Sequence, residues 1–319
     1  MSRYSKRPLE FTGLHTVRLE ERGGKVKTAD FASLYRKGSG MEAWLDSLPS
    51  ILAGVDFPKV VDAIFAARAR KRAIIWGLGG HVIKCGLAPV LIDLMRRGYA
   101  TVFALNGAAA IHDFEIALAG HTSEDVQAAL PDGRFGSAEE TGREMNAAVA
   151  DGARDDLGIG EALGRRLETA ADPAWAPFSL VLQAYRAAVP VTVHVAMGTD
   201  TPHVHPDADG AAIGGGSHRD FRLLCSYLAD LGDGGVYLNV GSAVLLPEVF
   251  LKAISALRNL GHALSGFTTA NFDFQQHYRP RMNVLERPHA GAGGAGYAIT
   301  GHHELMIPLL AAALIEKDS

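Results

Sequence analysis

The chain has 319 residues, of which 21% are charged, and its net charge of −4 leaves no basic footprint for a nucleic acid. Its longest apolar runs, such as residues 307–315, are too short to cross a bilayer, so no membrane partner is expected. The two cysteines, Cys85 and Cys225, lie in apolar helical patterns, which argues against a disulfide framework and predicts a reducing, cytoplasmic location.

Residues 1–55 are predicted to form a polar arm, with glycine breakers at 23–24 and 38–40 and a short amphipathic piece at 41–52. Such an arm is expected to pack on the outside of the domain or on a neighbouring subunit. A helix over 58–70 opens the remainder, residues 56–319, which we interpret as a single α/β domain.

The stretch from Arg72 to Glu115 organises this domain. It predicts a strand at 73–76, the glycine loop Gly77-Leu78-Gly79-Gly80, a helix over 82–97, and a second strand at 101–105 that ends in Asn106-Gly107-Ala108. Glycines between a strand and a helix let backbone N–H groups approach a ligand at the positive end of the helix. The pattern therefore favours a phosphate site.

The glycine loop is not a standard dinucleotide fingerprint. That motif needs a glycine where Val82 stands, and an acid where the second strand ends in Leu105-Asn106. A glycine-rich turn without a ligand therefore stays open as an alternative.

Helices and strands then alternate along the rest of the chain. Helices are predicted over 123–130, 138–153, 160–169, 178–188, 218–231, 247–260 and 304–316, and strands at 191–195, 236–239 and 267–272. This alternation is typical of a parallel sheet with helices on both faces, a Rossmann-like α/β fold.

Polar groups gather after the predicted strands. They are His112, Asp113 and Glu115 after the second strand, Gly198, Asp200, His203 and His205 after the third, Gly241, Ser242 and Glu248 after the fourth, and Asp273 after the fifth. In a parallel sheet these loops leave the same edge, where ligands bind.

The pair His203 and His205 has a separate interpretation. Residues two apart on an extended segment point to one side, so this pair can share a divalent metal with Asp200, Asp207 or His194. The alternatives are two loop histidines bonded to their neighbours, or one histidine that exchanges protons with a polar substrate or bonds to it.

Three segments resemble deoxyhypusine synthases, the NAD-dependent enzymes that transfer an aminobutyl group from spermidine to a lysine. The segments are IIWGLGGHVIKCGLAPVLIDLMRRGYATVFALNGAAAIHDFEIAL, VPVTVHVAMGTDTPHVHP and YLNVGSAVLLPEVFLKAISALRNLGH, and the likeness covers roughly residues 50–315. The amino-acid sequences of these segments are closer to the bacterial deoxyhypusine-synthase-like proteins than to the eukaryotic enzyme.

The resemblance implies an NAD-binding fold and a homotetramer with sites between subunits. It implies NAD contacts at Gly79, Gly80, His81, Asn106, Gly107 and Ala108, and further cofactor loops at Gly198, Asp200, Gly241 and Ser242. Gly77, in the same glycine loop as Gly79, is a further cofactor-binding candidate. It places His112 and Asp113 where the family has acids that hold an amine, and His205 where the family has its catalytic histidine.

One departure from the family bears on the reaction. The family's nucleophilic lysine follows a glycine loop, where this chain has Val244-Leu245-Leu246. Leucine cannot form an imine, so the family's covalent step is not expected.

The leading hypothesis is an NAD-dependent enzyme that acts on a small amine or polyamine. His205, Asp113 and His112 are the catalytic candidates, and Glu115, Asp200, His203 and Glu248 are the candidates for holding a cationic substrate. The alternatives are a metal-dependent hydrolase that uses His203 and His205, and a non-catalytic nucleotide-binding protein.

Overall fold

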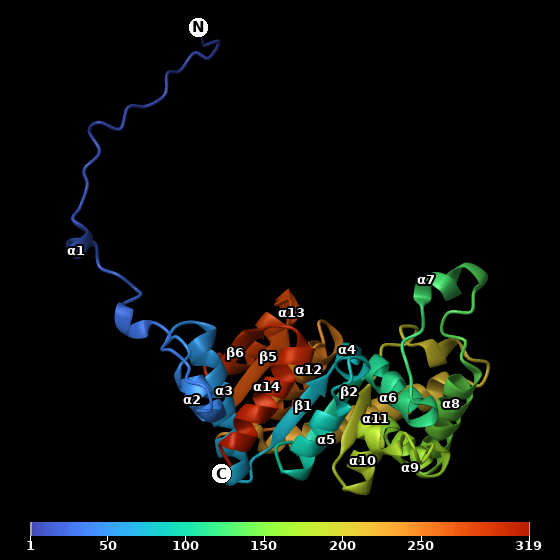
Figure 1. Cartoon of the computed structure of the whole chain (residues 1–319). Coiled ribbons are helices and arrows are strands. Elements are labelled where there is room, and N and C mark those ends of the chain that lie inside the picture. The colour runs from blue at the N-terminus through green and yellow to red at the C-terminus, as the bar shows by residue number, and fades with distance from the viewer. Residues whose placement is uncertain (1, 319) are drawn as a thin grey trace.

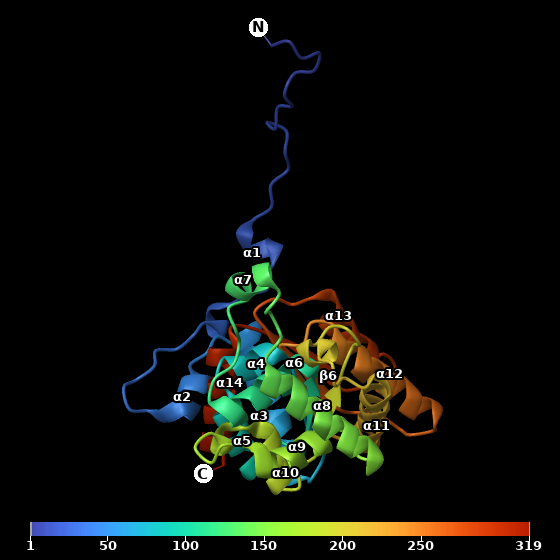
Figure 2. The same cartoon turned by 90° about the vertical axis from the view of Figure 1, so that its right-hand side faces the viewer.

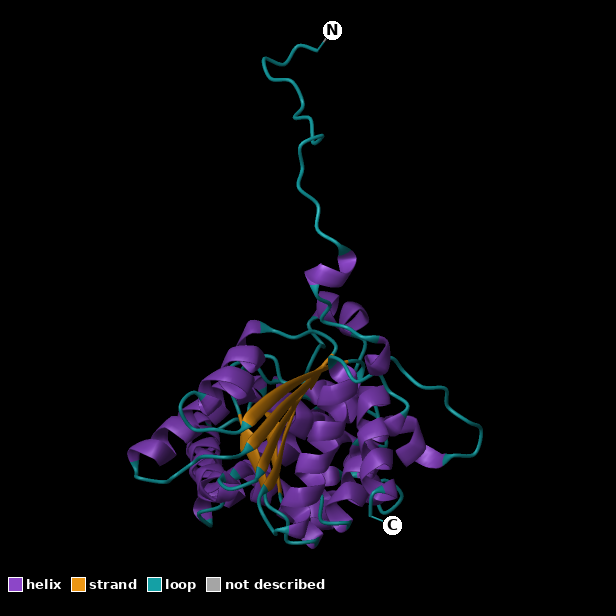
Figure 3. Ribbon diagram, turned by 90° about the vertical axis from the view of Figure 1, so that its left-hand side faces the viewer, coloured by secondary structure: helices purple, strands orange, loops and turns teal. Residues whose placement is uncertain are grey.

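A six-stranded parallel sheet forms the centre of the computed structural model, which describes residues 2–318. The strands are β1 (Ile74–Leu78), β2 (Val102–Asn106), β3 (Val191–His194), β4 (Val236–Val240), β5 (Thr268–Asp273) and β6 (Ala295–Thr300). They lie in the order β3-β2-β1-β4-β5-β6, and helices cover both faces (Figure 3). The predicted parallel, Rossmann-like α/β fold is confirmed.

The central strand β1 shows why two helical layers are needed, since all five of its residues are buried. Successive side chains of a strand point to opposite faces. Trp76 packs in the larger core, with α3 (Ala53–Ala69), α5 (Ala88–Arg96) and α14 (His303–Glu316), whereas Ile75 packs in the smaller one.

The other helices lie in the two layers, except α1 and α7, which lie outside them (Figure 1). They are α1 (Leu19–Arg22), α2 (Gly40–Asp46), α4 (Gly80–Lys84), α6 (Gly107–Ala119), α7 (Val126–Ala129), α8 (Glu139–Arg154), α9 (Ile159–Ala170), α10 (Leu180–Arg186), α11 (Gly210–Leu228), α12 (Leu245–Asn259) and α13 (Tyr278–Pro280). Helices α11 and α12 supply the helical part of the smaller core.

Several helix boundaries differ from the prediction, and two of the differences have a clear local cause. The single helix expected over 82–97 is divided into α4 and α5 at Gly86, whose φ of 85° lies in the left-handed region. Helix α11 begins at Gly210 instead of 218, because the Asp209 carboxylate accepts hydrogen bonds from the N–H groups of Ala211 and Ala212.

Strand β6 was missed because its glycines resemble a loop in the sequence. Gly296 lies in this strand, where a Cβ would stand 2.2 Å from the carbonyl oxygen of Leu285. The glycine therefore permits close packing of two backbone segments, and it is not a turn signal.

Two segments project from the body of the molecule. The N-terminal segment runs outward, with residues 2–29 all exposed, and the α6–α8 arm (residues 121–138) carries α7 away from the sheet (Figures 1 and 2). The boundary of the α/β domain at residue 55 stays a prediction, with α3 starting at Ala53. None of the helices described has both the length and the apolar character that a bilayer span requires.

Candidate functional site

A crevice is expected where β1 and β4 lie side by side. The chain leaves β1 toward β2 and leaves β4 toward β5, so the loops after these neighbouring strands diverge at the carboxyl edge. The two loops meet closely at their base: Gly79 N–H donates to Val240 O at 2.9 Å, and a Cβ on Gly79 would lie 2.1 Å from Gly241 O. Glycine is required there for the two loops to pack.

The β2–α6 junction forms one wall of this edge. The segment expected to be a loop is the first turn of α6, capped by Asn106 Oδ1, which accepts from Ala109 N–H at 2.9 Å. A Cβ on Gly107 would lie 1.9 Å from Asp200 Oδ2, so the Asp200 carboxylate lies directly against the start of α6.

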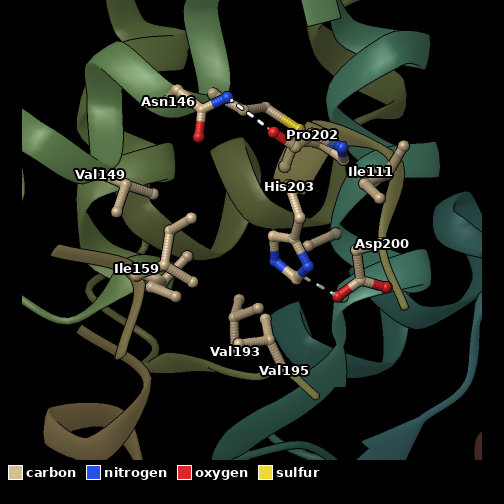
Figure 4. A pocket seen from close by; sticks show the side chains of 13 residues that line it. Ile111, Asn146, Val149, Ile159, Val193, Val195, Asp200, Pro202 and His203 are labelled. Carbon is tan, nitrogen blue, oxygen red and sulfur yellow. Dashed lines mark hydrogen bonds and ion pairs between the residues drawn. The ribbon is translucent and has the colours of Figure 1, made fainter. Parts of the chain in front are cut away.

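Asp200 and His203 line a small, mostly apolar cavity of about 30 Å³ (Figure 4). Asp200 Oδ2 accepts no hydrogen bond from the residues described, and the nearest charge partner is His203 Nε2 at 3.9 Å. Burial raises the pKa of Asp200, and His203 opposes this rise. An uncompensated, buried carboxylate favours a cationic ligand.

The tautomer of His203 follows from its hydrogen bonds. Gly198 N–H donates to His203 Nδ1 at 3.1 Å, so the proton of the neutral ring is on Nε2, which faces Asp200. Asn146 Nδ2 donates to Pro202 O at 2.9 Å and anchors this turn to α8 (Figure 4).

A hydrogen-bonded relay links His112, Thr122 and Glu115. The Thr122 hydroxyl donates to Glu115 Oε2, so it accepts from His112 Nδ1–H at 2.7 Å. Thr141 Oγ1 donates to the other carboxylate oxygen of Glu115 at 3.2 Å. The relay leaves the lone pair of His112 on Nε2, as a general base requires.

His112 lies beside the glycine loop at the crevice. Its Cδ2 atom would be 3.3 Å from a Cβ on Gly80, and Cδ2 adjoins Nε2 in the ring. Burial lowers the pKa of His112 below its ordinary value, while Glu115 raises it. The His112 ring is therefore neutral near pH 7.

A larger cavity of about 960 Å³ lies on the other side of the relay. It is bordered by Glu115, Thr122 and Thr141 together with residues of α8, α9 and the α6–α8 arm. The relay therefore stands between this cavity and the glycine loop.

Asp113 does not reach the crevice. It is fully buried, and its carboxylate accepts from Ser179 Oγ at 2.5 Å, Leu180 N at 2.6 Å and Val181 N at 3.0 Å. Burial raises its pKa to about 6, and these three hydrogen bonds oppose the rise. We therefore correct the catalytic role predicted for Asp113, which is an anchor for the start of α10.

His205 also faces away from the crevice. Its ring lies against Gly142 of α8, where a Cβ would stand 2.3 Å from Cδ2, and its Nδ1 accepts from Asp207 N–H at 3.2 Å. Residues Thr201–Val204 form a 3₁₀ turn, so His203 and His205 do not point to one side. The shared metal site, which was one of the alternatives for this pair, is not assembled there.

Two further candidates are already engaged by the protein. Glu248 lies at the surface, where Lys252, Arg279 and Asn283 all bond to its carboxylate. Gly77 is buried inside β1, where a Cβ would stand 2.5 Å from the Tyr237 hydroxyl. Both are removed from the set expected to touch ligands.

The remaining cofactor candidates lie at the carboxyl edge. Gly80 and His81 open α4, Gly79 offers α4 no side-chain cap, and the Val82 N–H donates to Gly79 O at 3.1 Å. Ser242 Oγ, in contrast, accepts from Leu246 N–H at 3.2 Å.

Sequence reasoning missed Thr122, Thr141 and Asn146 as site residues. Thr122 precedes Ser123 and resembles an ordinary helix cap, and Thr141 and Asn146 lie within a predicted helix. The distances in sequence between these residues and His112 or Glu115 do not predict the contacts, because the contacts depend on how the α6–α8 arm folds back onto the body of the molecule.

Sequence comparisons find no matching family model and no matching curated protein. Solved structures do match. A conserved LOR/SDH candidate protein from Methanococcus maripaludis S2 is 16% identical with a TM-score of 0.51, and the match covers 82% of this chain and 70% of that chain. AgrE, solved as a ternary complex with ornithine and NAD⁺, is 15% identical with a TM-score of 0.52, covering 82% of this chain and 33% of that one.

A deoxyhypusine synthase candidate from Entamoeba histolytica is 10% identical with a TM-score of 0.48, covering 88% of this chain and 94% of that one. ArgZ, an arginine dihydrolase from cyanobacteria, is 16% identical with a TM-score of 0.49, and the match covers 84% of this chain and 34% of that one. The present chain therefore spans only about a third of the AgrE and ArgZ chains that it matches. At these identities the likeness to AgrE and the LOR/SDH protein establishes a common α/β fold.

Proposed function

We propose that this protein is an NAD-dependent enzyme acting on a small amine or polyamine. The observation that carries the proposal is the Asp200 carboxylate, which is buried beside the edge crevice with one oxygen that accepts no hydrogen bond from the described residues. An ammonium group is a ligand that satisfies such an oxygen by a charge-assisted hydrogen bond.

The strand order supports a dinucleotide as the cofactor. The loops after β1 and β4 diverge at a topological switch point, where folds of this kind bind nucleotides. The start of α6 already has Asn106 and Asp200 against it. We therefore assign the phosphates to Gly79, Gly80 and His81, and the amine to the Gly107 side.

Each polar group then has a task in amine oxidation. Bound NAD would supply the hydride acceptor. Asp200 holds the ammonium group, and His112 Nε2 takes the proton that the amine releases as its carbon is oxidised. Thr122 and Glu115 fix the His112 tautomer and stabilise the charged ring. Water or a second amine captures the oxidised carbon without a lysine adduct.

The proposal is tested by NAD reduction with a panel of diamines and polyamines. Asp200→Asn should lower kcat/KM by about tenfold to hundredfold, since a hydrogen bond to a charged group contributes roughly 1.5–3 kcal/mol. Asp207→Asn, an exposed change in the same loop, should behave as wild type. Equal kcat/KM for Asp200→Asn and wild type would remove the amine assignment.

The non-catalytic alternative predicts a different result. The protein would then gain thermal stability with NAD while consuming none of the amines. Ligand at about a hundred times its dissociation constant stabilises a fold by about 2.7 kcal/mol, so binding without turnover is readily detected. If NAD did not raise the thermal stability of the protein, both the enzymatic and the non-catalytic NAD-binding hypotheses would be contradicted.

A further inference from the structure

Three metal-ligating side chains meet beside the glycine loop, outside the relay and the Asp200 cavity. His81 and Cys85 come from α4 and its C-terminal end, and Glu304 comes from the first turn of α14. One ligand atom from each residue lies within 4.8 Å of the other two. Residues four apart share one helix face, which explains how His81 and Cys85 meet.

The donor set indicates the class of cation. A thiolate, an imidazole and a carboxylate together suit zinc and similar transition metals, whereas magnesium and calcium take oxygen ligands. Bond lengths of about 2.0–2.3 Å in a tetrahedral site place ligand atoms roughly 3.4 Å apart. The three ligand atoms, now within 4.8 Å of one another, would close to that distance on binding a cation.

A buried histidine next to the cluster supplies a second, independent observation. His303 is 1% exposed, and its Nε2–H donates to Phe272 O at 3.0 Å. Its Nδ1 therefore carries a lone pair, and no described residue donates to it. The His303 ring lies 5.5 Å from the His81 ring, and His303 directly precedes Glu304. A water on an open metal position is the kind of donor that this nitrogen lacks.

We propose that His81, Cys85 and Glu304 bind one zinc-class divalent cation, with a fourth position open to water. The cation joins α4 to α14 at the rim of the crevice. Partial exposure of the three residues gives it access from solvent. This site is distinct from the His203 and His205 pair, and it does not depend on the reaction proposed above.

The site is tested with chelator-treated, full-length protein, without NAD. Wild type should take up one zinc ion per chain in equilibrium dialysis, and cobalt(II) should give a thiolate-to-cobalt charge-transfer band. Cys85→Ser should abolish the band, and Glu304→Gln should weaken zinc binding at least about tenfold.

Matched controls come from the same chain. Cys225→Ser removes the other free thiol, and Glu316→Gln changes a carboxylate at the far end of α14; both should retain the band and the zinc affinity of wild type. Wild type that retains no zinc overturns the proposal, as does a cobalt band that survives Cys85→Ser. Circular dichroism checks that each variant folds.

Discussion

At the scale of single residues, burial alone does not identify a functional carboxylate. Asp113 and Asp200 both follow strands and both have raised pKa values through burial. Asp113 is surrounded by three donors from Ser179, Leu180 and Val181, whereas one oxygen of Asp200 accepts nothing from the described residues. The sequence could predict that polar groups collect at this edge, but their hydrogen-bond partners come from segments up to 68 residues away.

Asp113→Asn should lower the free energy of unfolding by about 1–3 kcal/mol, because an amide NH₂ would face backbone donors that the carboxylate now satisfies. Urea denaturation measures the change. Asp93→Asn, which removes an exposed ion pair with Arg97, should cost at most about 1 kcal/mol. A variant as stable as wild type, with kcat strongly reduced, would restore the catalytic role.

Glu115→Gln should shift the pH dependence of the proposed amine oxidation. Glu115 raises the pKa of His112, so its loss lowers that pKa further. The base acts when deprotonated, and kcat/KM falls as pH drops through its pKa. The acid limb of kcat/KM should therefore move to lower pH, while kcat falls by about tenfold to hundredfold as the relay is broken.

Two comparisons separate this role from a structural one. Thr122→Ser keeps the hydroxyl and should keep the wild-type profile, whereas Thr122→Val should behave like Glu115→Gln. Glu161→Gln, an exposed change on α9, should leave the profile unchanged. An acid limb that stays in place in Glu115→Gln would exclude His112 as the base.

At the scale of elements, the sequence predicted five of the six strands and the parallel sheet, because buried strands and amphipathic helices have distinct periods. It failed where glycine is used for packing. Gly296 makes β6 resemble a loop in the sequence, and the Gly214–Gly216 run makes the first half of α11 resemble one. Local sequence cannot tell a glycine that turns the chain from one that admits a neighbouring backbone.

Gly79→Ala and Gly214→Ala test this distinction. A Cβ at position 79 would lie 2.1 Å from a backbone oxygen, so we expect a loss of about 1–3 kcal/mol in stability and a loss of the NAD-induced thermal shift. A Cβ at position 214 meets nothing within 4 Å, so alanine there should stabilise α11 by about 0.5–1 kcal/mol. Equal effects at the two positions would contradict the packing argument.

At the scale of the whole molecule, the N-terminal segment is unusual in what it exposes. Ten large apolar side chains between Tyr4 and Tyr35 are exposed, and residues 31–40 are exposed throughout. Apolar surface of this extent is typical of a segment that packs on another protein surface. We expect that surface to belong to a second copy of the chain, within the homotetramer that the sequence resemblance implies.

Removing residues 1–39 should therefore reduce the oligomer. Light scattering of the full chain should give a tetramer, and the shortened chain should give a smaller species at the same concentration. The deletion ends before α2, so the packing of α2 on α14 is retained in the shortened chain. A monomeric full chain would contradict the expectation.

The α6–α8 arm touches both halves of the proposed site. Thr122 at its start belongs to the relay, and Gly136 near its end packs on Thr201, where a Cβ would stand 2.5 Å from the threonine methyl group. Thr201 adjoins Asp200. A partner that displaces the arm would therefore weaken both the proposed amine capture and the proposed proton removal. The arm would then offer one contact through which both steps of the proposed reaction respond together.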